Sequence, residues 1–257
     1  MFMNPDDTDG PDPSHPRYES LMRRRRLVSG FREGIVVPEG LIAHGRGEMF
    51  DYLLGEVSIP PALMAERAGA AFILDARNPV ISVNGNAAAL SAESIAELST
   101  VSGAKIEVNL FHWSEERASV IRSVLESCGA KNVLAEEADA FLEGINHDRG
   151  RCHVEGIYSA DVVLIPLEDG DRAQALAEMG KTVISIDLNP LSRTSLSASV
   201  SIVDELTRAV PNMIGFAREL KGDKKKISET IGSYDNSDVL RAVFRHISER
   251  FEKLYRD

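Results

Sequence analysis

The chain has 257 residues, of which 43% are hydrophobic and 27% charged, proportions typical of a globular protein with a sizeable core. Its formal net charge of −11 argues against bulk binding to nucleic acid or to an anionic membrane. No apolar run is long enough to cross a bilayer, and the N-terminus lacks a signal-peptide pattern. The two cysteines, Cys128 and Cys152, make no disulfide framework. We therefore expect a cytoplasmic protein with free thiols.

The N-terminal part combines a tail with a basic helix. Residues 1–16 are rich in Asp and Pro, which predicts a disordered tail. A helix is predicted from about Ser20 to Gly34, and it carries the basic run Arg23 to Arg26. Because successive helical residues are turned by about 100°, these four side chains cannot share one face. We expect one or two of them at most to enter a site and the others to lie on the solvated surface.

The segment 41–51, LIAHGRGEMFD, follows as a predicted polar turn. Gly45 and Gly47 lack a Cβ atom, which permits tight turning and the close approach of a ligand. Arg46 between them offers donors that match phosphate or carboxylate oxygens. His44 is a candidate general acid, base or hydrogen-bond donor, although a lone His is more often structural.

From Ser58 onward, short apolar strands alternate with amphipathic helices, which indicates a parallel sheet covered on both faces. The predicted fold class is α/β, Rossmann-like and doubly wound, with a mostly parallel sheet of about five or six strands. We expect one domain over 17–257, with an N-terminal helical segment (17–57), a core (58–220) and a C-terminal helical segment (221–257) that opens with a charged linker. The strands are predicted at 80–83, 105–111, 132–135, 161–167, 182–188 and 200–203.

Polar turns follow three of these strands, at 84–86, 168–171 and 187–189, and they lie at the edge where parallel sheets bind ligands. The turn at Asn84-Gly85-Asn86 either presents backbone N–H groups to a phosphate or is a plain turn with Asn86 as helix N-cap. Asp187 either accepts from ribose hydroxyls or caps its own turn. Arg193, in a loop rich in hydroxyl groups, suits a phosphate, although a solvated loop is commoner.

Several catalytic classes are excluded by missing motifs. The sequence has no P-loop and no Gly-x-Gly-x-x-Gly after its first strand. It has no serine nucleophile elbow, and the spacing of His147, Asp148, Cys152 and His153 fits no zinc pattern. We therefore predict no dedicated metal site and identify no catalytic residue. Substrate positioning and charge stabilisation fit the chain better than covalent catalysis.

The chain resembles the archaeal phosphopantothenate synthetase family, that is, 4-phosphopantoate–β-alanine ligase, over about residues 15–256. Long blocks in the right order carry this resemblance, and they are more specific than any short motif. They are HPRYESL (15–21), GLIAHGRGEMFDYLLG (40–55), PVISVNGN (79–86), AKIEVNLF (104–111), ADVVLIPLEDGDR (160–172), IDLNPLSR (186–193) and IVD (202–204).

The resemblance implies an ATP-driven ligase that condenses 4-phosphopantoate with β-alanine through an acyl-adenylate. The products are 4′-phosphopantothenate, AMP and diphosphate, and the reaction belongs to coenzyme A biosynthesis. Mg²⁺ that bridges phosphates is expected, with few or no protein ligands. The resemblance also implies a homodimer, to which the amphipathic C-terminal helix could contribute, with no nucleic-acid or membrane partner. Two alternatives are a non-catalytic nucleotide sensor and another Rossmann-like phosphosugar or nucleotide enzyme.

The resemblance further implies a set of nucleotide contacts, namely Arg24, Arg46, Asp187, Leu188, Asn189, Arg193, Thr194, Glu205 and Leu206. Glu205 departs from the family pattern, which usually has Asn after Val-Asp, and a glutamate is unfavourable beside phosphate. We expect contact there only through the backbone, or to the sugar or base. Phosphopantoate is assigned to His44, Asn84, Gly85 and Asn86, because a strand-to-helix turn forms a nest of phosphate size.

Overall fold

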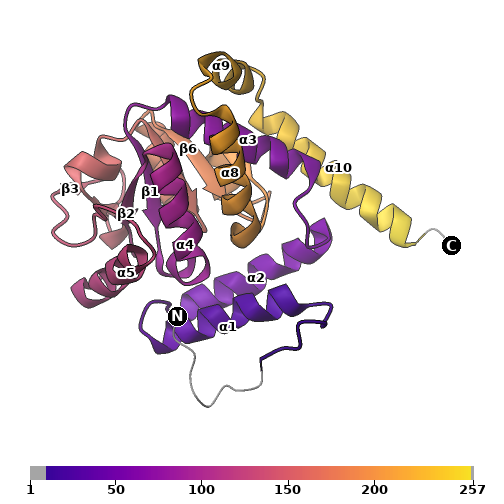
Figure 1. Ribbon diagram of the computed structural model, residues 1–257, viewed down its shortest axis with the longest axis horizontal. Helices are drawn as coiled ribbons and strands as arrows, with labels where there is room; N and C mark the ends of the chain where they lie inside the picture. The colour runs from indigo at the N-terminus through magenta and orange to yellow at the C-terminus, as the bar shows by residue number, and fades with distance from the viewer. Residues whose placement is uncertain (1–9, 256–257) are drawn as a thin grey trace.

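A five-stranded parallel sheet forms the centre of the computed structural model, which describes residues 10–255 (Figure 1). The strand order is β2-β1-β5-β6-β7, and each neighbouring pair is parallel. The predicted α/β fold class and strand number are therefore confirmed. The strands are β1 (Pro79–Val83), β2 (Lys105–Val108), β5 (Val162–Pro166), β6 (Thr182–Ile186) and β7 (Val200–Ile202).

The strand predicted at 132–135 is wrong as an element. In the described chain this segment contributes a single parallel bridge, from Leu134 to Glu107 beside β2. Asn132 adopts a φ of 52°, a left-handed conformation that breaks extended backbone before a strand can form.

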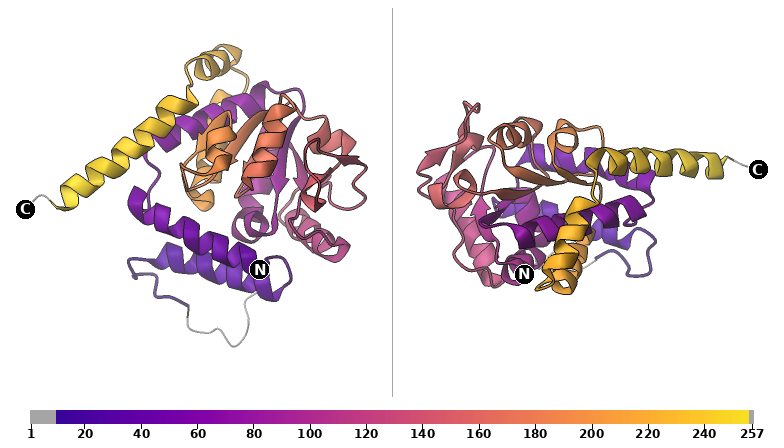
Figure 2. Two further views of the ribbon diagram at one scale, coloured as in Figure 1. Left: turned by 180° about the vertical axis from the view of Figure 1, so that it is seen from behind. Right: turned by 90° about the horizontal axis from the view of Figure 1, so that it is seen from above.

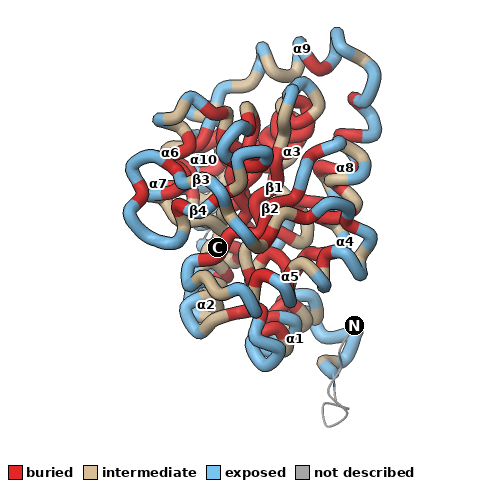
Figure 3. Tube along the Cα trace, turned by 90° about the vertical axis from the view of Figure 1, so that its left-hand side faces the viewer, coloured by how far each residue is buried: buried red, intermediate tan, exposed pale blue. Residues whose placement is uncertain are grey.

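Alternate side chains along the strands enter two hydrophobic cores, as the pleat of a strand requires. On one face Ile81 and Leu164 join a core with α3 (Pro60–Asp75), α4 (Gly85–Ser102), α5 (Glu115–Ser127) and α8 (Leu206–Leu220). On the other face Val80 and Val163 join a core with α6 (Gly170–Glu178), and α7 (Arg193–Ser197) packs beside that helix. Both faces are thus covered, and buried residues concentrate in the sheet and the inner sides of its helices (Figures 2 and 3).

A small peripheral unit lies beside the β1 and β2 side of the sheet. Strands β3 (Ala140–Phe141) and β4 (Arg151–Cys152) pair antiparallel, with short helical turns at Asp148–Gly150 and Val154–Tyr158. The buried carboxylate of Glu107 holds this unit, because it accepts from the backbone N–H of His153 at 3.1 Å and of Ile157 at 2.6 Å. The unit therefore has a fixed position relative to the end of β2.

The C-terminal part is more helical than predicted. The charged linker predicted over 221–226 is wrong in its second half, because α9 (Lys224–Gly232) begins there. Asp223 caps this helix by accepting from the backbone N–H of Lys226, and Ile227 is buried against Ala71 and Leu220. The last helix, α10 (Asn236–Leu254), contacts α3 and α2 and then extends away from the body of the molecule (Figure 1).

Two N-terminal helices, α1 (Tyr18–Arg32) and α2 (Pro38–Leu54), lie together at the carboxyl edge of the sheet (Figure 1). The turn predicted at 41–51 is wrong, because this segment is the interior of α2. Pro38 stands in the first turn, and Gly55 ends the helix with a φ of 99°. Each helical glycine costs about 1 kcal/mol relative to Ala, but Glu48, Asp51 and Leu54 bury one side of the helix and outweigh that cost.

Buried ion pairs join these helices to the core. Arg23 is only 4% exposed, and its guanidinium lies 3.3 Å from Asp51. Arg208 of α8 pairs with Asp51 at 2.5 Å and with Asp204 at 2.6 Å. We call these four residues the charge cluster. The expectation that Arg23 lies on the solvated surface is therefore wrong, since Asp51 on the facing helix α2 draws it inward.

The structure tests two further expectations only in part. Much of the predicted disordered tail, residues 1–9, lies outside the described residues. Between residues 10 and 255, no helix is both long and apolar enough to cross a membrane.

Candidate active site

A cavity of about 630 Å³ opens between α2 and the carboxyl edge of the sheet. Its walls are α2 on one side and the segments that follow β1, β2, β5, β6 and β7 on the other. The strand order reverses between β1 and β5, which is where ligands bind in open α/β sheets. The volume is in the range of ordinary ligand sites.

Most residues that the sequence singled out line this cavity. They are His44, Arg46, Asn84, Gly85, Asn86, Asp187, Leu188, Asn189, Arg193, Thr194, Glu205 and Leu206. Arg24 is not among the lining residues. It lies on α1, with its guanidinium 2.5 Å from Glu48, so its nucleotide contact stays a prediction.

Helix N-termini converge on the cavity. Helices α4, α6 and α8 each begin shortly after a strand, and their first residues Gly85, Gly170 and Leu206 all line the wall. The free N–H groups of a helix's first turn, together with its dipole, favour a negatively charged ligand. Carboxylates of Asp169 and Glu205 already cap α6 and α8, whereas α4 is capped by the neutral Asn84, so the β1 turn is the part of this edge best suited to an anion.

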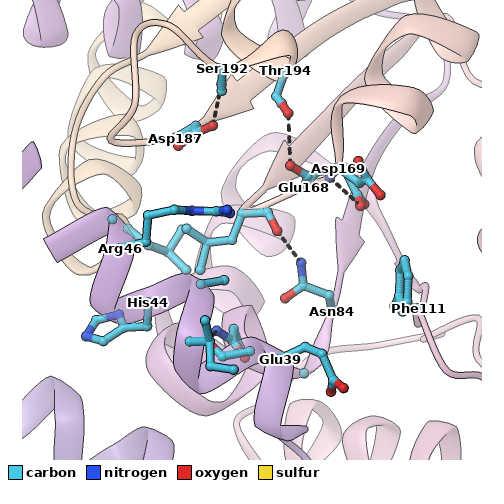
Figure 4. Close-up of a pocket in the computed structure, with 18 of the residues that line it drawn as sticks. Glu39, His44, Arg46, Asn84, Phe111, Glu168, Asp169, Asp187, Ser192 and Thr194 are labelled. Atoms are coloured by element: carbon cyan, nitrogen blue, oxygen red, sulfur yellow. Dashed lines mark hydrogen bonds between the residues drawn. The ribbon is translucent and has the colours of Figure 1, made fainter. Parts of the chain in front are cut away.

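Arg46 is the open cation of the site. Its side chain extends from α2 into the cavity, on the side where Asp187 lies (Figure 4). Among the described residues it forms neither a hydrogen bond nor an ion pair, and it is exposed. Its guanidinium is therefore available to a phosphate or carboxylate of a ligand.

The turn after β6 is held by Asp187. Its carboxylate accepts from the backbone N–H of Asn189 at 2.9 Å and from the hydroxyl of Ser192 at 2.5 Å. Burial raises the pKa of Asp187, while these hydrogen bonds and the charge of Arg46 oppose the rise. Thr194 ties the next helix to the β5 turn by donating to the carbonyl of Glu168 at 2.9 Å. The loop therefore has a fixed shape before any ligand enters.

The two asparagines of the β1 turn are engaged in the fold. Asn84 caps α4 by accepting from Ala87 at 3.0 Å, and its amide donates to the carbonyl of Leu167 at 2.9 Å. Asn86 donates to the carbonyl of Gly40 at 2.8 Å and so holds α2 against α4. The alternative that Asn86 is the N-cap is wrong. What this turn offers a ligand is backbone N–H rather than side-chain amides.

Glycine is required at the β1 turn. A Cβ atom on Gly85 would lie 2.2 Å from the carbonyl oxygen of Ile35, so no other residue fits without movement of the backbone. Arg117 donates to the same carbonyl at 3.1 Å and also lines the cavity.

His44 points away from Asn84, toward the side of α2 that faces α1 (Figure 4). Its Nε2 atom is buried without a hydrogen-bond partner among the described residues. Burial lowers the pKa of His44, with a smaller contribution from Arg23 and Arg24 and an opposing one from Glu48. The ring is therefore expected to be neutral at physiological pH.

The carboxylate of Glu205 is engaged with groups of the protein. It caps α8 by accepting from the backbone N–H of Thr207 at 2.6 Å, and it lies 3.8 Å from Arg23. Burial raises the pKa of Glu205, and the nearby guanidinium of Arg23 opposes the rise. A glutamate is thus compatible with an anion site here, because its charge is balanced by α1.

Sequence reasoning placed the turn of Glu168 and Asp169 on the ligand side of the sheet, but it missed Phe111 and Arg149 as residues of the cavity wall. The guanidinium of Arg149 lies 5.0 Å from the centre of the Phe111 ring and pairs with Glu168. The Glu168-Asp169-Gly170 turn follows a predicted strand, so its position was a usable signal. The sequence contains no such signal for Arg149, because this residue comes from the irregular stretch before β4.

The described residues contain no group of three or more His, Cys, Asp or Glu side chains that could hold a metal ion. Cys152 is buried, and burial, with Glu107 nearby, raises the pKa of its thiol to about 12. This thiol is therefore unreactive at neutral pH.

Comparison with known proteins decides the family. Residues 61–250 match the sequence model of a family described as Phosphopantothenate/pantothenate synthetase. The chain belongs to this family. A 4-phosphopantoate--beta-alanine ligase from Methanosarcina mazei is 53% identical over 93% of this chain and 95% of its own length. One of the same name from Thermococcus kodakarensis is 46% identical, over 94% of this chain and 93% of its own.

Likeness to solved structures is much weaker. A shikimate dehydrogenase from Mycobacterium tuberculosis is 16% identical and covers 66% of this chain and 62% of its own, with a TM-score of 0.33. A score at this level carries no argument about function or site.

Proposed function

We propose that this protein is the ligase that joins 4-phosphopantoate to β-alanine with ATP, giving 4′-phosphopantothenate, AMP and diphosphate in coenzyme A biosynthesis. The names of its relatives support this function. The observation that carries it in the structure is the convergence of Arg46 and the N-termini of α4, α6 and α8 on one cavity. The reaction brings a triphosphate, a substrate phosphate and a carboxylate together, and such a site stabilises all three.

The nucleotide is assigned to the β6 and β7 side of the cavity. Arg46 and Arg193 would contact phosphates, while Asp187 and the backbone of Leu188, Asn189, Thr194, Glu205 and Leu206 would contact the rest of the nucleotide. Arg24 joins this set by resemblance only. Phosphopantoate is assigned to the β1 side, where the backbone of Asn84, Gly85 and Asn86 forms the phosphate nest. His44 belongs to that set on the sequence alone, because its ring points away from Asn84 (Figure 4).

In the proposed chemistry the pantoate carboxylate attacks the α-phosphorus of ATP and releases diphosphate. The amine of β-alanine then attacks the acyl carbon of the adenylate, and AMP leaves. The protein's part is to align the groups and to neutralise charge on the phosphates, since no nucleophilic side chain is required. When bound, Mg²⁺ would neutralise charge on the phosphates.

A cytoplasmic homodimer built on residues 17–257 as one ligase domain is part of the proposal. The outer part of α10 supports the dimer, because Phe244, Phe251 and Leu254 are 39%, 46% and 67% exposed on a helix that extends from the body. Substituting Phe251 by Glu should shift the chain to a monomer in light scattering, and an unchanged mass would argue against this surface.

The test of the reaction is AMP release from ATP and Mg²⁺, with 4-phosphopantoate and β-alanine added singly and together. We expect AMP in stoichiometric amounts only when both acids are present, with 4′-phosphopantothenate identified by mass spectrometry. Folded protein that binds ATP but releases no AMP would instead favour the nucleotide sensor.

A further inference from the structure

One end of the cavity is unused by the assignments above. It is lined by Phe111 after β2, Arg149 before β4 and Asp169 after β5. Phe111 and Asp169 lie on the side away from Arg46 and His44 (Figure 4). Three separate segments thus meet here, beside the Thr194 contact to the carbonyl of Glu168, and they bring one cation, one anion and one aromatic ring that have no assigned ligand.

Arg149 is fixed in position by its neighbours. Its guanidinium packs on the ring of Phe111 with 5.0 Å to the centroid and pairs with Glu168. Glu168 is itself held by Arg172 at 2.5 Å and by the backbone N–H of Asp169 at 2.9 Å. The Arg149 side chain is only 12% exposed. Such a rigid, partly desolvated arginine is suited to recognising a carboxylate.

Arg149 also has donor capacity left. Its Nε atom is buried and has no hydrogen-bond partner among the described residues. A buried N–H without a partner calls for an explanation, and a ligand is one. Glu168 is shared between Arg149 and Arg172, so two cations face one carboxylate and positive charge remains.

Asp169 supplies the opposite charge. Its carboxylate caps α6 through a long contact of 3.4 Å to the backbone N–H of Asp171, which leaves most of its acceptor capacity free. Burial, and then the nearby charge of Arg172, lower the pKa of Arg149 to about 10. The negative charge of Asp169 acts in the opposite direction and favours the charged guanidinium. Arg149 and Arg172 are together balanced by Glu168 and Asp169, so the group has no excess charge to attract a phosphate dianion, whereas a small zwitterion meets a partner for each of its charges.

We propose that this end of the cavity is the binding site of the amino-acid substrate, whose carboxylate pairs with Arg149 and whose amino group pairs with Asp169. Phe111 lines the space between these polar groups with apolar surface for the methylene chain. The inference rests on the proposed ligase function and deepens it by naming residues for the second substrate, whose binding site is distinct from that of the phosphorylated acid. Arg149 and Asp169 are then the residues that decide which amines are accepted.

The test uses Arg149→Ala and Arg149→Lys in the full chain. Loss of a charged, paired hydrogen bond predicts a rise of about 10- to 100-fold in the KM for β-alanine, with partial recovery in the lysine variant. Phosphopantoate-dependent exchange of diphosphate into ATP, measured without β-alanine, is expected to be unchanged. β-Alaninamide, which lacks the carboxylate, should react equally well with wild type and Arg149→Ala.

Arg151→Ala is the matched control. Arg151 lies two residues farther along and also stacks on an aromatic ring, with 4.8 Å to the centroid of Trp113, but it does not line the cavity. Its removal should leave the KM for β-alanine unchanged. Melting temperatures identify any loss of folding, and Glu168 keeps its pairing with Arg172 when Arg149 is removed.

Asp169→Asn provides a second, independent variant, because Asn caps a helix as well as Asp does. It should raise the KM for β-alanine and for β-alaninamide alike, since both carry an ammonium group.

The inference is overturned if folded Arg149→Ala loses the exchange reaction, because the residue would then serve phosphopantoate or the nucleotide. It is also overturned if the variant keeps the wild-type KM for β-alanine. Failure of the proposed function has another signature, namely wild-type protein that forms no AMP with both acids present.

Discussion

Arg23 and Arg46 lie on neighbouring helices at the same edge of the sheet, yet their surroundings are opposite. Arg23 is buried in the charge cluster, with Asp51 and Glu205 as partners. Arg46 is exposed to the cavity and, in the described chain, has no partner. A paired, buried arginine therefore holds helices together, whereas an arginine without an ion pair at a cavity wall is available to a ligand.

The largest expected effect concerns the buried member of this pair. Arg23→Ala leaves Glu205 without its cation and weakens the hold on Asp51, which should cost about 3 kcal/mol of stability. For a chain of this size that is on the order of 10 °C in melting temperature. Arg32→Ala, an exposed position on the same helix, is the control and should have almost no effect. An unchanged melting temperature for Arg23→Ala would contradict the role of the charge cluster.

Arg46→Ala should show the reverse pattern, with a normal melting temperature and lower activity. One charged hydrogen bond to the nucleotide or substrate corresponds to a loss of roughly 10- to 100-fold in kcat/KM for AMP formation. Arg218→Ala, which removes an exposed ion pair with Glu97, is the control. Small and equal activity losses in Arg46→Ala and Arg23→Ala would remove Arg46 from the site.

A third prediction concerns the carboxylates behind the charge cluster. Glu66 is fully buried, and its carboxyl group lies beside that of Asp204 and the amide of Asn212. Burial, and then the adjacent Asp204, raise the pKa of Glu66 from 4.5 to about 9. Below the ordinary pKa both states of the protein hold this proton. Between 4.5 and 9 only the folded state keeps it, so the contribution of Glu66 to stability falls as pH rises through this window.

Glu66→Gln mimics the protonated side chain and removes that pH dependence. We expect the variant to melt a few degrees above wild type at about pH 8 and at nearly the same temperature at about pH 4. Thermal melts of both proteins across this range check the prediction. A variant that is less stable at the higher pH would show that Glu66 is ionised in the folded chain.

The smallest effect is expected at Arg24. Like Arg23 it is paired with a carboxylate, but like Arg46 it is exposed. Its side chain is 45% exposed and pairs with Glu48. Arg24→Ala should therefore cost under about 1 kcal/mol of stability. Because Arg24 lies outside the cavity wall, its loss should lower kcat/KM less than the loss of Arg46 does. An unchanged kcat/KM for ATP would remove Arg24 from the nucleotide contacts.

The sequence by itself determined the sheet, its parallel sense and the edge that carries the site. Continuous apolar strands such as Val162–Pro166 have few alternatives, and each is followed by polar residues where a parallel strand must end. It also placed Asp187, Arg193 and Gly85 at that edge, because a residue's position relative to a strand end is a local property.

Only the tertiary structure decided what depends on distant neighbours. Gly45 and Gly47 predicted a turn, but burial of one side of α2 makes the segment helical. Arg23 and Arg24 are adjacent in sequence, and the carboxylates of Asp51 and Glu205, which come from distant segments, pair with the buried Arg23. Arg149 reaches the cavity because the β3 and β4 unit is fastened to Glu107, a contact between residues far apart in the chain. Such pairings are set by packing, which no local pattern of residues records.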